Sequence, residues 1–362
     1  MPQTPRTMYY RGGDTVNEPI LSVKDLNLKF SLRGQTLHAL RDVCLDVYKG
    51  ESLAIVGESG SGKSVLTKCF LGLNDANGYI ESGSILYEGM DLAAFKKESE
   101  WLKIRGREIA MVMQDPMTSL NPLRTIGAQI LESINLHQKN LTPAQAKTKM
   151  LDMLDQVGIY DPEKRAKQYP HEFSGGMRQR VVIAIALACK PKILICDEPT
   201  TALDVTIQAQ ILKLIKTLVK ESGITAIYIT HDLGVVANVS TRIAVMYAGD
   251  IVEIGTSEEI FYDPRHPYTW ALLSSLPQLG VKGEKLYSIA GTQANLFARV
   301  EGDAFAPRNP YALKMDYVKR PPYFELSPTH KARTWLLDAR APKVEPPEII
   351  RKLSRREVDL NG

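Results

Sequence analysis

The chain has 362 residues, of which 44% are hydrophobic and 24% are charged, the composition of an ordinary globular protein with a sizeable core. A net charge of +4, with no block of basic residues, does not favour a nucleic-acid-binding protein. The longest apolar run, at 181–189, is far shorter than the roughly 20 residues of a membrane span. The N-terminus lacks the apolar core of a signal peptide, so we expect the chain to stay in the cytoplasm unless a partner holds it at a membrane.

The N-terminal part predicts strands. We expect residues 1–18 to form a flexible tail. Strand-like segments follow at 20–30 and 38–48, and the short apolar run at 52–56 is typical of a buried parallel strand. A glycine-rich segment interrupts this pattern, and a helix is predicted at 64–73.

The middle of the chain alternates buried strands with helices. Strands are predicted at 109–113, 193–197 and 225–230, and the segment 243–255 alternates like a hairpin. Strands that alternate with helices favour an α/β fold with a mostly parallel, doubly wound sheet. Within 120–172 the sequence is polar and helical, and we expect a helical insert at about 115–175.

The sequence also indicates where one helix of the insert begins and ends, and where the chain changes character after residue 260. In the helical insert, Thr142 is a predicted helix N-cap and Gly158 a predicted helix end. From about 260 prolines become frequent and periodicity weakens, which indicates a small appended domain over 261–341. Residues 342–362 contain three prolines and mixed charges, and we expect them to form a tail.

The segment GESGSGKS at 57–64 fits the phosphate-loop pattern GxxxxGK[ST]. It follows an apolar strand and precedes a helix, which is the context that the pattern requires. Backbone N–H groups of such a loop face phosphates, Lys63 can reach the β- and γ-phosphates, and Ser64 can ligate Mg²⁺. The predicted nucleotide-binding residues are Gly57, Glu58, Ser59, Gly60, Ser61, Gly62, Lys63 and Ser64.

Other polar residues follow buried strands, where ligands bind in open α/β sheets. Asp197 ends one strand and fits a metal ligand, and Glu198 fits a group that orients and deprotonates water. His231 follows another strand and is a candidate γ-phosphate contact. Gln114 could bridge metal and water, and Phe30 could stack on adenine. Acidic residues at strand ends are common, a lone histidine is more often structural, and core packing would also explain the phenylalanine.

A second anion site is indicated at FSGGMRQR, residues 173–180, where a serine and two glycines precede a helix. Together with GESGSGKS, QDPMTSLNP, CDEPTTALD and ITHD, in this order along the chain, it resembles the nucleotide-binding subunit of ABC transporters over about 20–255. The resemblance implies that Ser174, Gly175 and Gly176 bind the γ-phosphate of ATP held by the other cassette of a dimer. It also places Asp204, the last residue of CDEPTTALD, at the nucleotide. Methionine replaces the commoner glutamine after the two glycines, and we expect little effect.

A closer similarity extends to about residue 340. QDPMTSLNP, SGGMRQRVVIAIALAC and HPYTWALLSSLP are similar to the D-type ATPase subunit of oligopeptide importers, in the Firmicute form. The resemblance implies a P-loop cassette at 19–260, with an antiparallel β subdomain and an α-helical subdomain, and a C-terminal extension at 261–341. It further implies Mg²⁺-dependent ATP hydrolysis at the cytoplasmic face of the cell membrane.

The implied partners are a second, different ATPase, two transmembrane permease subunits and an extracellular peptide-binding protein.

Two other functions are alternatives to an ATPase that drives peptide import. An ABC protein that acts on ribosomes or DNA usually has two cassettes or a long coiled coil, and neither is present. A regulatory subunit without turnover predicts the loss of Glu198 or His231, and both are retained.

One departure from the family concerns iron. Many peptide-permease ATPases have four cysteines in this C-terminal domain that bind an iron–sulfur cluster. Here the frame GDAFAPRNPYALKMD at 302–316, followed by HKART at 330–334, has Asp303, Asn309, Asp316 and Thr334 at those positions. Because clusters need thiolate ligands, we expect none. Two carboxylates could hold a hard cation instead, although local hydrogen bonds explain them more simply. The domain is then expected to be held by its prolines and by Trp270, Phe305, Tyr311, Phe324 and Trp335.

Overall fold

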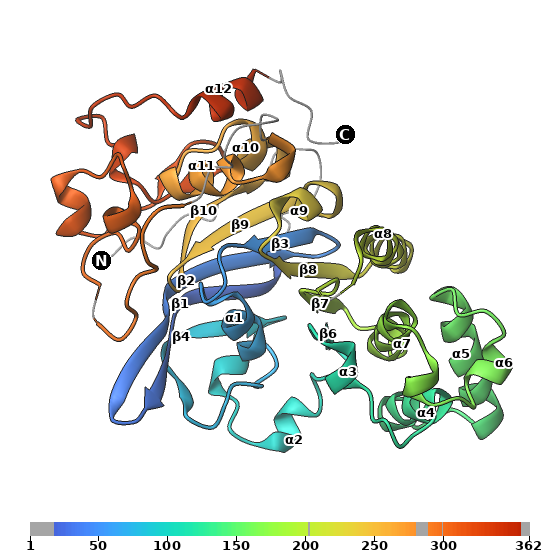
Figure 1. Ribbon diagram of the computed structural model, residues 1–362. Coiled ribbons are helices and arrows are strands. Elements are labelled where there is room, and N and C mark those ends of the chain that lie inside the picture. The colour runs from blue at the N-terminus through green and yellow to red at the C-terminus, as the bar shows by residue number, and fades with distance from the viewer. Residues whose placement is uncertain (1–17, 202, 280–288, 299, 356–362) are drawn as a thin grey trace.

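The computed structural model describes residues 18–201, 203–279, 289–298 and 300–355. Two β-sheets share one hydrophobic core, and helices cover the other face of the larger sheet (Figure 1). The helical insert projects from one end of the larger sheet, and the C-terminal region covers the other end. The flexible tail predicted at 1–18 lies, apart from residue 18, outside the described residues.

The smaller sheet is antiparallel, with the strand order β2-β1-β4-β5. The long hairpin of β1 and β2 confirms the strands predicted at 20–30 and 38–48. Arg33 and Gly34 make its turn with φ values of 48° and 80°, which suits the twist of a two-residue hairpin. The sequence analysis did not identify β4. The strands are β1 (Pro19–Leu32), β2 (Gln35–Tyr48), β4 (Gly78–Tyr87) and β5 (Met90–Asp91).

The larger sheet has the order β11-β12-β10-β9-β3-β8-β7-β6. The pairings from β9 to β6 are parallel, which confirms the mostly parallel sheet, and those from β9 to β11 are antiparallel. Ala248 and Gly249, both with positive φ, turn the predicted hairpin of β9 and β10. The strands are β3 (Ser52–Val56), β6 (Ile109–Val112), β7 (Ile193–Asp197), β8 (Thr225–Thr230), β9 (Arg242–Tyr247), β10 (Asp250–Thr256), β11 (Phe324–Glu325) and β12 (Lys331–Ala332).

Successive side chains of the parallel strands point to opposite faces of the sheet and pack into two hydrophobic cores. In β3, Leu53 and Ile55 point into the core that β1, β2 and α1 (Lys63–Cys69) share. Ala54 and Val56 point into the opposite core. Both faces of these strands are therefore buried, which is why they appear in the sequence as uninterrupted apolar runs. The rigid centre of the sheet fixes where the residues that follow each strand lie.

The second core is closed by helices. Most of the apolar run 181–189 belongs to α7 (Gly175–Leu187), where a buried helix was predicted. Helix α8 (Val205–Ser222) packs against α7, and α9 (Leu233–Val239) packs against α8. In the helical insert, Thr142 caps α5 (Pro143–Gln156) by accepting the N–H of Gln145, and Gly158 follows the helix with a φ of 74°. The remaining helices of this half are α2 (Glu98–Trp101), α3 (Pro116–Ser119), α4 (Ile126–His137) and α6 (Pro162–Arg165).

The C-terminal region continues the larger sheet, because β12 pairs with β10 and carries β11. His330 Nε2 lies 2.7 Å from Glu253 Oε1 of β10, and both side chains are almost fully buried. The aromatic residues proposed for this region form edge contacts: Trp270 with Tyr311, Phe324 with Trp335, and Phe305 with Tyr247. The helices of this region are α10 (Ser257–Tyr262) and α11 (Pro267–Ser274), and its 3-10 turns are Pro277–Leu279, Ala306–Arg308, Lys314–Tyr317 and Trp335–Leu337. Two further 3-10 turns, Leu92–Ala94 and Pro170–Glu172, lie earlier in the chain.

The tail predicted at 342–362 needs a correction. Within it the structure forms α12 (Glu348–Ser354), which contacts α10 and α11. Ile350 and Leu353 are at most 1% exposed and belong to the second core. The burial of these apolar side chains outweighs the surrounding prolines and charges. Residues 356–362 lie outside the described part of the chain.

Candidate active site

The phosphate loop joins β3 to α1, in the place that the sequence predicts. Gly57 has a φ of 154°, and a Cβ there would come 2.1 Å from the carbonyl oxygen of Met246 in β9. Gly62 has a φ of 104° at the N-cap of α1. Glycine is therefore required at 57 by a close backbone approach and at 62 by a left-handed conformation. Lys63 Nζ donates to the carbonyl oxygens of Gly57 and Glu58, at 2.8 and 2.9 Å.

Ser64 and Asp197 meet at the start of α1. The Ser64 hydroxyl donates to Asp197 Oδ1 at 2.9 Å, which joins the loop to the end of β7. Burial raises the pKa of Asp197. The hydrogen bond from Ser64 opposes this rise, and the negative charge of the neighbouring Glu198 adds to it. A cation bound here would offset that cost, and hard oxygen donors are the ligands that Mg²⁺ prefers. The residues present therefore fit a magnesium site.

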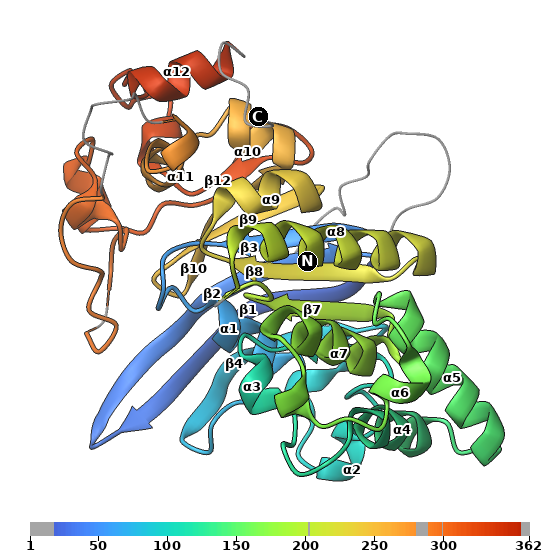
Figure 2. The same cartoon turned by 45° about the vertical axis from the view of Figure 1, so that its right-hand side comes forward.

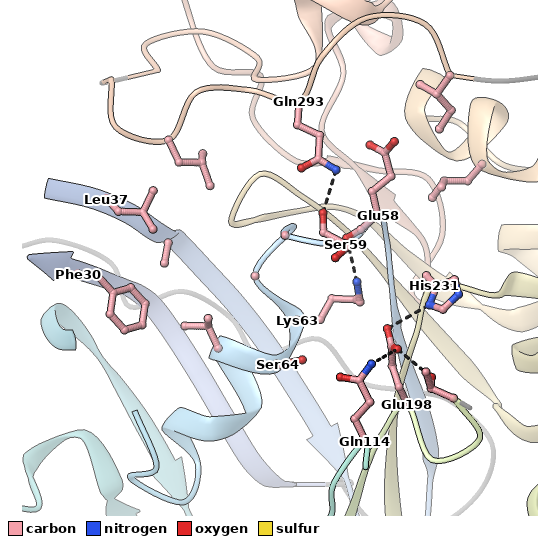
Figure 3. A pocket seen from close by; sticks show the side chains of 18 of the residues that line it. Phe30, Leu37, Glu58, Ser59, Lys63, Ser64, Gln114, Glu198, His231 and Gln293 are labelled. Atoms are coloured by element: carbon pink, nitrogen blue, oxygen red, sulfur yellow. Dashed lines mark hydrogen bonds and ion pairs between the residues drawn. The ribbon is translucent and has the colours of Figure 1, made fainter. Parts of the chain in front are cut away.

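Glu198 lies at the centre of a hydrogen-bonded network (Figure 3). Its Oε2 accepts from Gln114 Nε2 at 3.0 Å and from the Thr201 hydroxyl at 2.9 Å. Its Oε1 lies 3.0 Å from His231 Nδ1. The residue has a φ of 46°, a backbone conformation that is uncommon outside glycine and that concentrates at functional sites. Residues that follow β6, β7 and β8 thus converge on one carboxylate.

The network determines the protonation state of Glu198. Burial acts to raise its pKa, but the hydrogen bonds from His231 and Thr201, together with the positive charge of nearby groups such as Lys63, outweigh burial, so the pKa lies below its ordinary value. The side chain is therefore an ionised hydrogen-bond acceptor at neutral pH. An ionised carboxylate can orient a water molecule and take its proton.

Apart from Asp197, which lies behind Ser64, the side chains of this network line one cleft of about 1020 Å³. Phe30 lies on one side with Leu37 and Ala39, and the ring also packs against Gly78. Side chains of the C-terminal region form part of the wall: Leu272, Ser275, Ile289, Gln293 and Leu296. The predicted residues that line it are Phe30, Glu58, Ser59, Gly60, Gly62, Lys63, Ser64, Gln114, Glu198 and His231.

The second predicted anion site lies elsewhere. Ser174 caps α7 by accepting the N–H of Met177, and Ser174, Gly175 and Gly176 do not line the cleft. Ser174 and Gly175 are exposed. Asp204 does not line it either, and its carboxylate caps α8 through the N–H of Ile207 at 2.9 Å. The structure therefore does not bring these four residues to the phosphate loop of their own chain.

Several contacts of the site were missed by the sequence analysis. Thr201 belongs to a motif that was quoted but was given no role. Tyr268 accepts the N–H of Glu58 at 2.8 Å, Gln293 donates to the Ser59 carbonyl at 2.8 Å, and Arg308 forms an ion pair with Glu58. Tyr268 lies in the HPYT run that resembles the peptide-importer ATPases, so the sequence drew attention to it. No local pattern relates Gln293 or Arg308 to the phosphate loop.

Comparisons with known proteins identify the family. Residues 40–201 match the ABC transporter family, and residues 252–315 match the "Oligopeptide/dipeptide transporter, C-terminal region". The chain is 56% identical to the oligopeptide transport ATP-binding protein AmiE of Streptococcus pneumoniae over 92% of this chain and 94% of that protein. The chain belongs to this family of ABC transporter ATP-binding proteins. The resemblance inferred from the sequence motifs is confirmed.

Other relatives of this ABC ATPase are similar over nearly their whole lengths. It is 55% identical to the oligopeptide transport ATP-binding protein OppD of Bacillus subtilis, covering 93% of this chain and 94% of that protein. It is 53% identical to the dipeptide transport ATP-binding protein DppD of Lactococcus lactis, covering 95% and 99%. In the described part of the chain, no helix has the length and hydrophobicity that a membrane crossing requires.

Solved structures confirm the cassette fold. A dimeric ATP-binding cassette in a post-hydrolysis state, bound to ADP and Pi, is 28% identical with a TM-score of 0.58, and the match covers 66% of this chain and 98% of that chain. CbiO1 from Clostridium perfringens, described as part of an ABC transporter complex, is 30% identical with a TM-score of 0.59, and the match covers 68% and 92%.

Proposed function

We propose that this chain hydrolyses ATP to drive the import of oligopeptides through an ABC transporter. The observation that carries the proposal is the convergence of Lys63, Ser64, Gln114, Glu198 and His231 on one cleft. Relatives named for oligopeptide and dipeptide transport support the substrate class, as does the match to their C-terminal region.

Within this proposal each side chain has a distinct role. The phosphate loop and Lys63 bind the β- and γ-phosphates, and Phe30 packs on the adenine. Ser64, Asp197 and Gln114 would hold Mg²⁺, which neutralises phosphate charge when bound. Glu198 orients the attacking water and accepts its proton, while His231 contacts the γ-phosphate and holds the Glu198 carboxylate from the other side.

We further propose that ATP is hydrolysed between two cassettes. Ser174, Gly175 and Gly176 do not line the cleft of their own chain, which supports a role at a partner's nucleotide, together with Asp204. The backbone N–H groups that begin α7 make this segment a suitable anion site. A second, different ATPase subunit would supply the equivalent segment to Lys63.

The proposed complex contains two transmembrane permease subunits and an extracellular peptide-binding protein, with this chain at the cytoplasmic face of the membrane. The proposed domains are a cassette at 19–260, with its helical subdomain at about 115–175, and a C-terminal domain at 261–341. Because α10 (Ser257–Tyr262) crosses the boundary at 260 and β12 pairs with β10, the two domains would unfold as one unit.

We also propose that the C-terminal domain folds without an iron–sulfur cluster. At the four positions discussed above, each side chain accepts a nearby backbone N–H: Asp303 from Phe305, Asn309 from Tyr311, Asp316 from Leu313, and Thr334 from Leu336. These local hydrogen bonds stabilise the turns that a cluster would otherwise hold together. The cysteines of the chain are free thiols at other positions, namely Cys44, Cys69, Cys189 and Cys196.

The test of the function is the ATPase rate against protein concentration, with and without the second ATPase of the complex. We expect a low rate from the isolated chain and a steep increase when the second cassette is added. Ser174→Arg should suppress hydrolysis in the mixed dimer while leaving ATP binding by the isolated chain intact.

A high rate that is independent of concentration would contradict the two-cassette site. Tight ATP binding without hydrolysis in the complete complex, in the presence of a transported peptide, would favour a regulatory subunit instead.

A further inference from the structure

Arg308 connects the C-terminal region to the phosphate loop across 250 residues of sequence. Its Nη1 and Nη2 atoms donate to the two carboxylate oxygens of Glu58, at 2.5 and 3.0 Å. The Arg308 side chain is only 4% exposed, and that of Glu58 is 24% exposed. A two-point contact of this kind fixes the orientation of both side chains as well as their distance.

The other donors of Arg308 are also occupied. Its Nε donates to the carbonyl oxygen of Ala290 at 2.9 Å, and Nη2 also reaches that of Ile289 at 3.3 Å. The guanidinium lies 5.8 Å from the ring centre of Tyr247. Arg308 therefore ties Glu58 both to the segment that begins at residue 289 and to the end of β9.

Glu58 in turn holds the part of the loop that positions Lys63. Its carbonyl oxygen accepts from Lys63 Nζ at 2.9 Å, and its N–H donates to the hydroxyl of Tyr268 at 2.8 Å. Figure 3 shows the Glu58 carboxylate directed away from Lys63, on the side of the loop where Gln293 reaches Ser59. The side chain of Glu58 is thus used for anchoring and its backbone for the lysine.

We propose that Arg308 is a positioning residue for nucleotide binding, which acts by holding Glu58 and hence the phosphate loop in its binding conformation. The proposal rests on the ATP-binding function proposed above. It assigns to the C-terminal region a direct influence on nucleotide affinity. Arg308 itself contributes no ligand to the phosphates.

The chain offers a matched control at the other end of β3. Arg242 and Glu51 form a similar pair, with Arg242 Nη1 within 3.0 Å of both Glu51 oxygens and side chains 14% and 10% exposed. Arg242 also lies over an aromatic ring, that of Tyr48, at 5.0 Å. Glu51 precedes the strand and Glu58 follows it, so only the second pair touches the loop.

The experiment compares Arg308→Gln and Arg242→Gln in the full-length chain. The dissociation constants of ATP and ADP with Mg²⁺ are measured by calorimetry, and thermal unfolding is followed without nucleotide. Removing one partner of a buried pair is strongly destabilising, so both variants should unfold at lower temperature. We expect only Arg308→Gln to raise the nucleotide dissociation constants, by about tenfold. In the two-cassette complex, its KM should rise with little change in kcat.

Two further variants sharpen the test, and the first of them also keeps it decisive if Arg308→Gln does not fold. Arg308→Lys retains the charge but not the two-point contact, and should bind nucleotide with an intermediate affinity. The double variant Glu58→Gln/Arg308→Gln removes both charges, and its loss of affinity should be smaller than the sum of the losses measured for Glu58→Gln and Arg308→Gln separately.

Nucleotide affinities of the Arg308 variants within twofold of the wild type would overturn the proposal. Equal losses in the Arg242 and Arg308 variants would overturn it too, since they would reflect general destabilisation. If the wild-type chain does not bind ATP, the proposed function fails along with this inference. Normal ATP binding by the wild type and by the Arg308 variants alike would refute the positioning role alone.

Discussion

His266 gives the folded chain a specific sensitivity to acid. The side chain is fully buried at the N-cap of α11, where its Nδ1 accepts the N–H of Tyr268 at 3.0 Å. Burial lowers its pKa from 6.5 to about 4, and the nearby Glu253 carboxylate opposes this only in part. The folded chain therefore holds this imidazole neutral, whereas the unfolded chain takes up a proton near pH 6.5.

The direction and size of the effect follow from this difference. Between pH 6.5 and about 4 the unfolded state binds more protons, so the free energy of unfolding decreases as the pH falls. At 1.36 kcal/mol per pH unit, the full contribution is about 3 kcal/mol. About 2 kcal/mol of it should be lost between roughly pH 7.5 and pH 5.

The assay is urea unfolding of the nucleotide-free chain at several pH values over this range. His266→Asn retains an acceptor for the Tyr268 N–H but cannot titrate, so its free energy of unfolding should decrease less steeply with acid. Thr269→Val, at the next fully buried polar residue of the same helix, is the control. Its curve should run parallel to that of the wild type. Parallel curves for the wild type and His266→Asn would refute the reasoning.

Four further outcomes are expected. Glu198→Gln should bind ATP normally but lower the kcat of the assembled complex by about 10²- to 10⁴-fold, and near-wild-type turnover would remove Glu198 from its role. Lys63→Ala should weaken ATP binding by about tenfold or more in calorimetry, and an unchanged affinity would contradict the phosphate-loop assignment. Burial raises the pKa of Asp303 to about 7, so the free energy of unfolding decreases as the pH rises from 3.8 to 7. Asp303→Asn should reduce this decrease in urea unfolding, and an equal decrease in the wild type and the variant would contradict the account. Anaerobically purified protein should contain no stoichiometric iron and show no visible absorbance of a cluster; about four irons per chain would prove this wrong.

The parts of the site that the sequence could predict are those in which local chemistry and sheet topology agree. Gly57 and Gly62 mark a loop between a buried strand and a helix, and Asp197, Glu198 and His231 each stand at or just after the end of a strand. Because β3, β7 and β8 are parallel neighbours, their carboxyl ends had to meet at one edge. The convergence therefore followed from the order of the strands alone.

The parts that it could not predict depend on long-range packing. Nothing in the sequence near Arg308 or Gln293 indicates that they contact the phosphate loop, which lies more than two hundred residues earlier. In α12, Ile350 and Leu353 lie on one face of the helix. A helix of seven residues shows too little hydrophobic periodicity to be recognised in the sequence, and the prolines before it favour an irregular segment. These residues are ordered by the core that they join rather than by their own propensity.

The network around Glu198 also suggests how hydrolysis and movement are connected on the proposed mechanism. Gln114 follows β6 and directly precedes the helical insert, so any displacement of α3 relative to the sheet changes its distance from Glu198. The Glu198 carboxylate holds Gln114, Thr201 and His231 at hydrogen-bonding distance, which occupies three of the about four acceptor positions of a carboxylate. Thr201 follows β7 and His231 follows β8, and the two cores keep both strands rigid. Of the three partners, Gln114 is the one next to the helical insert, so on the proposed mechanism a displacement of the insert would alter the hydrogen bonding of Glu198.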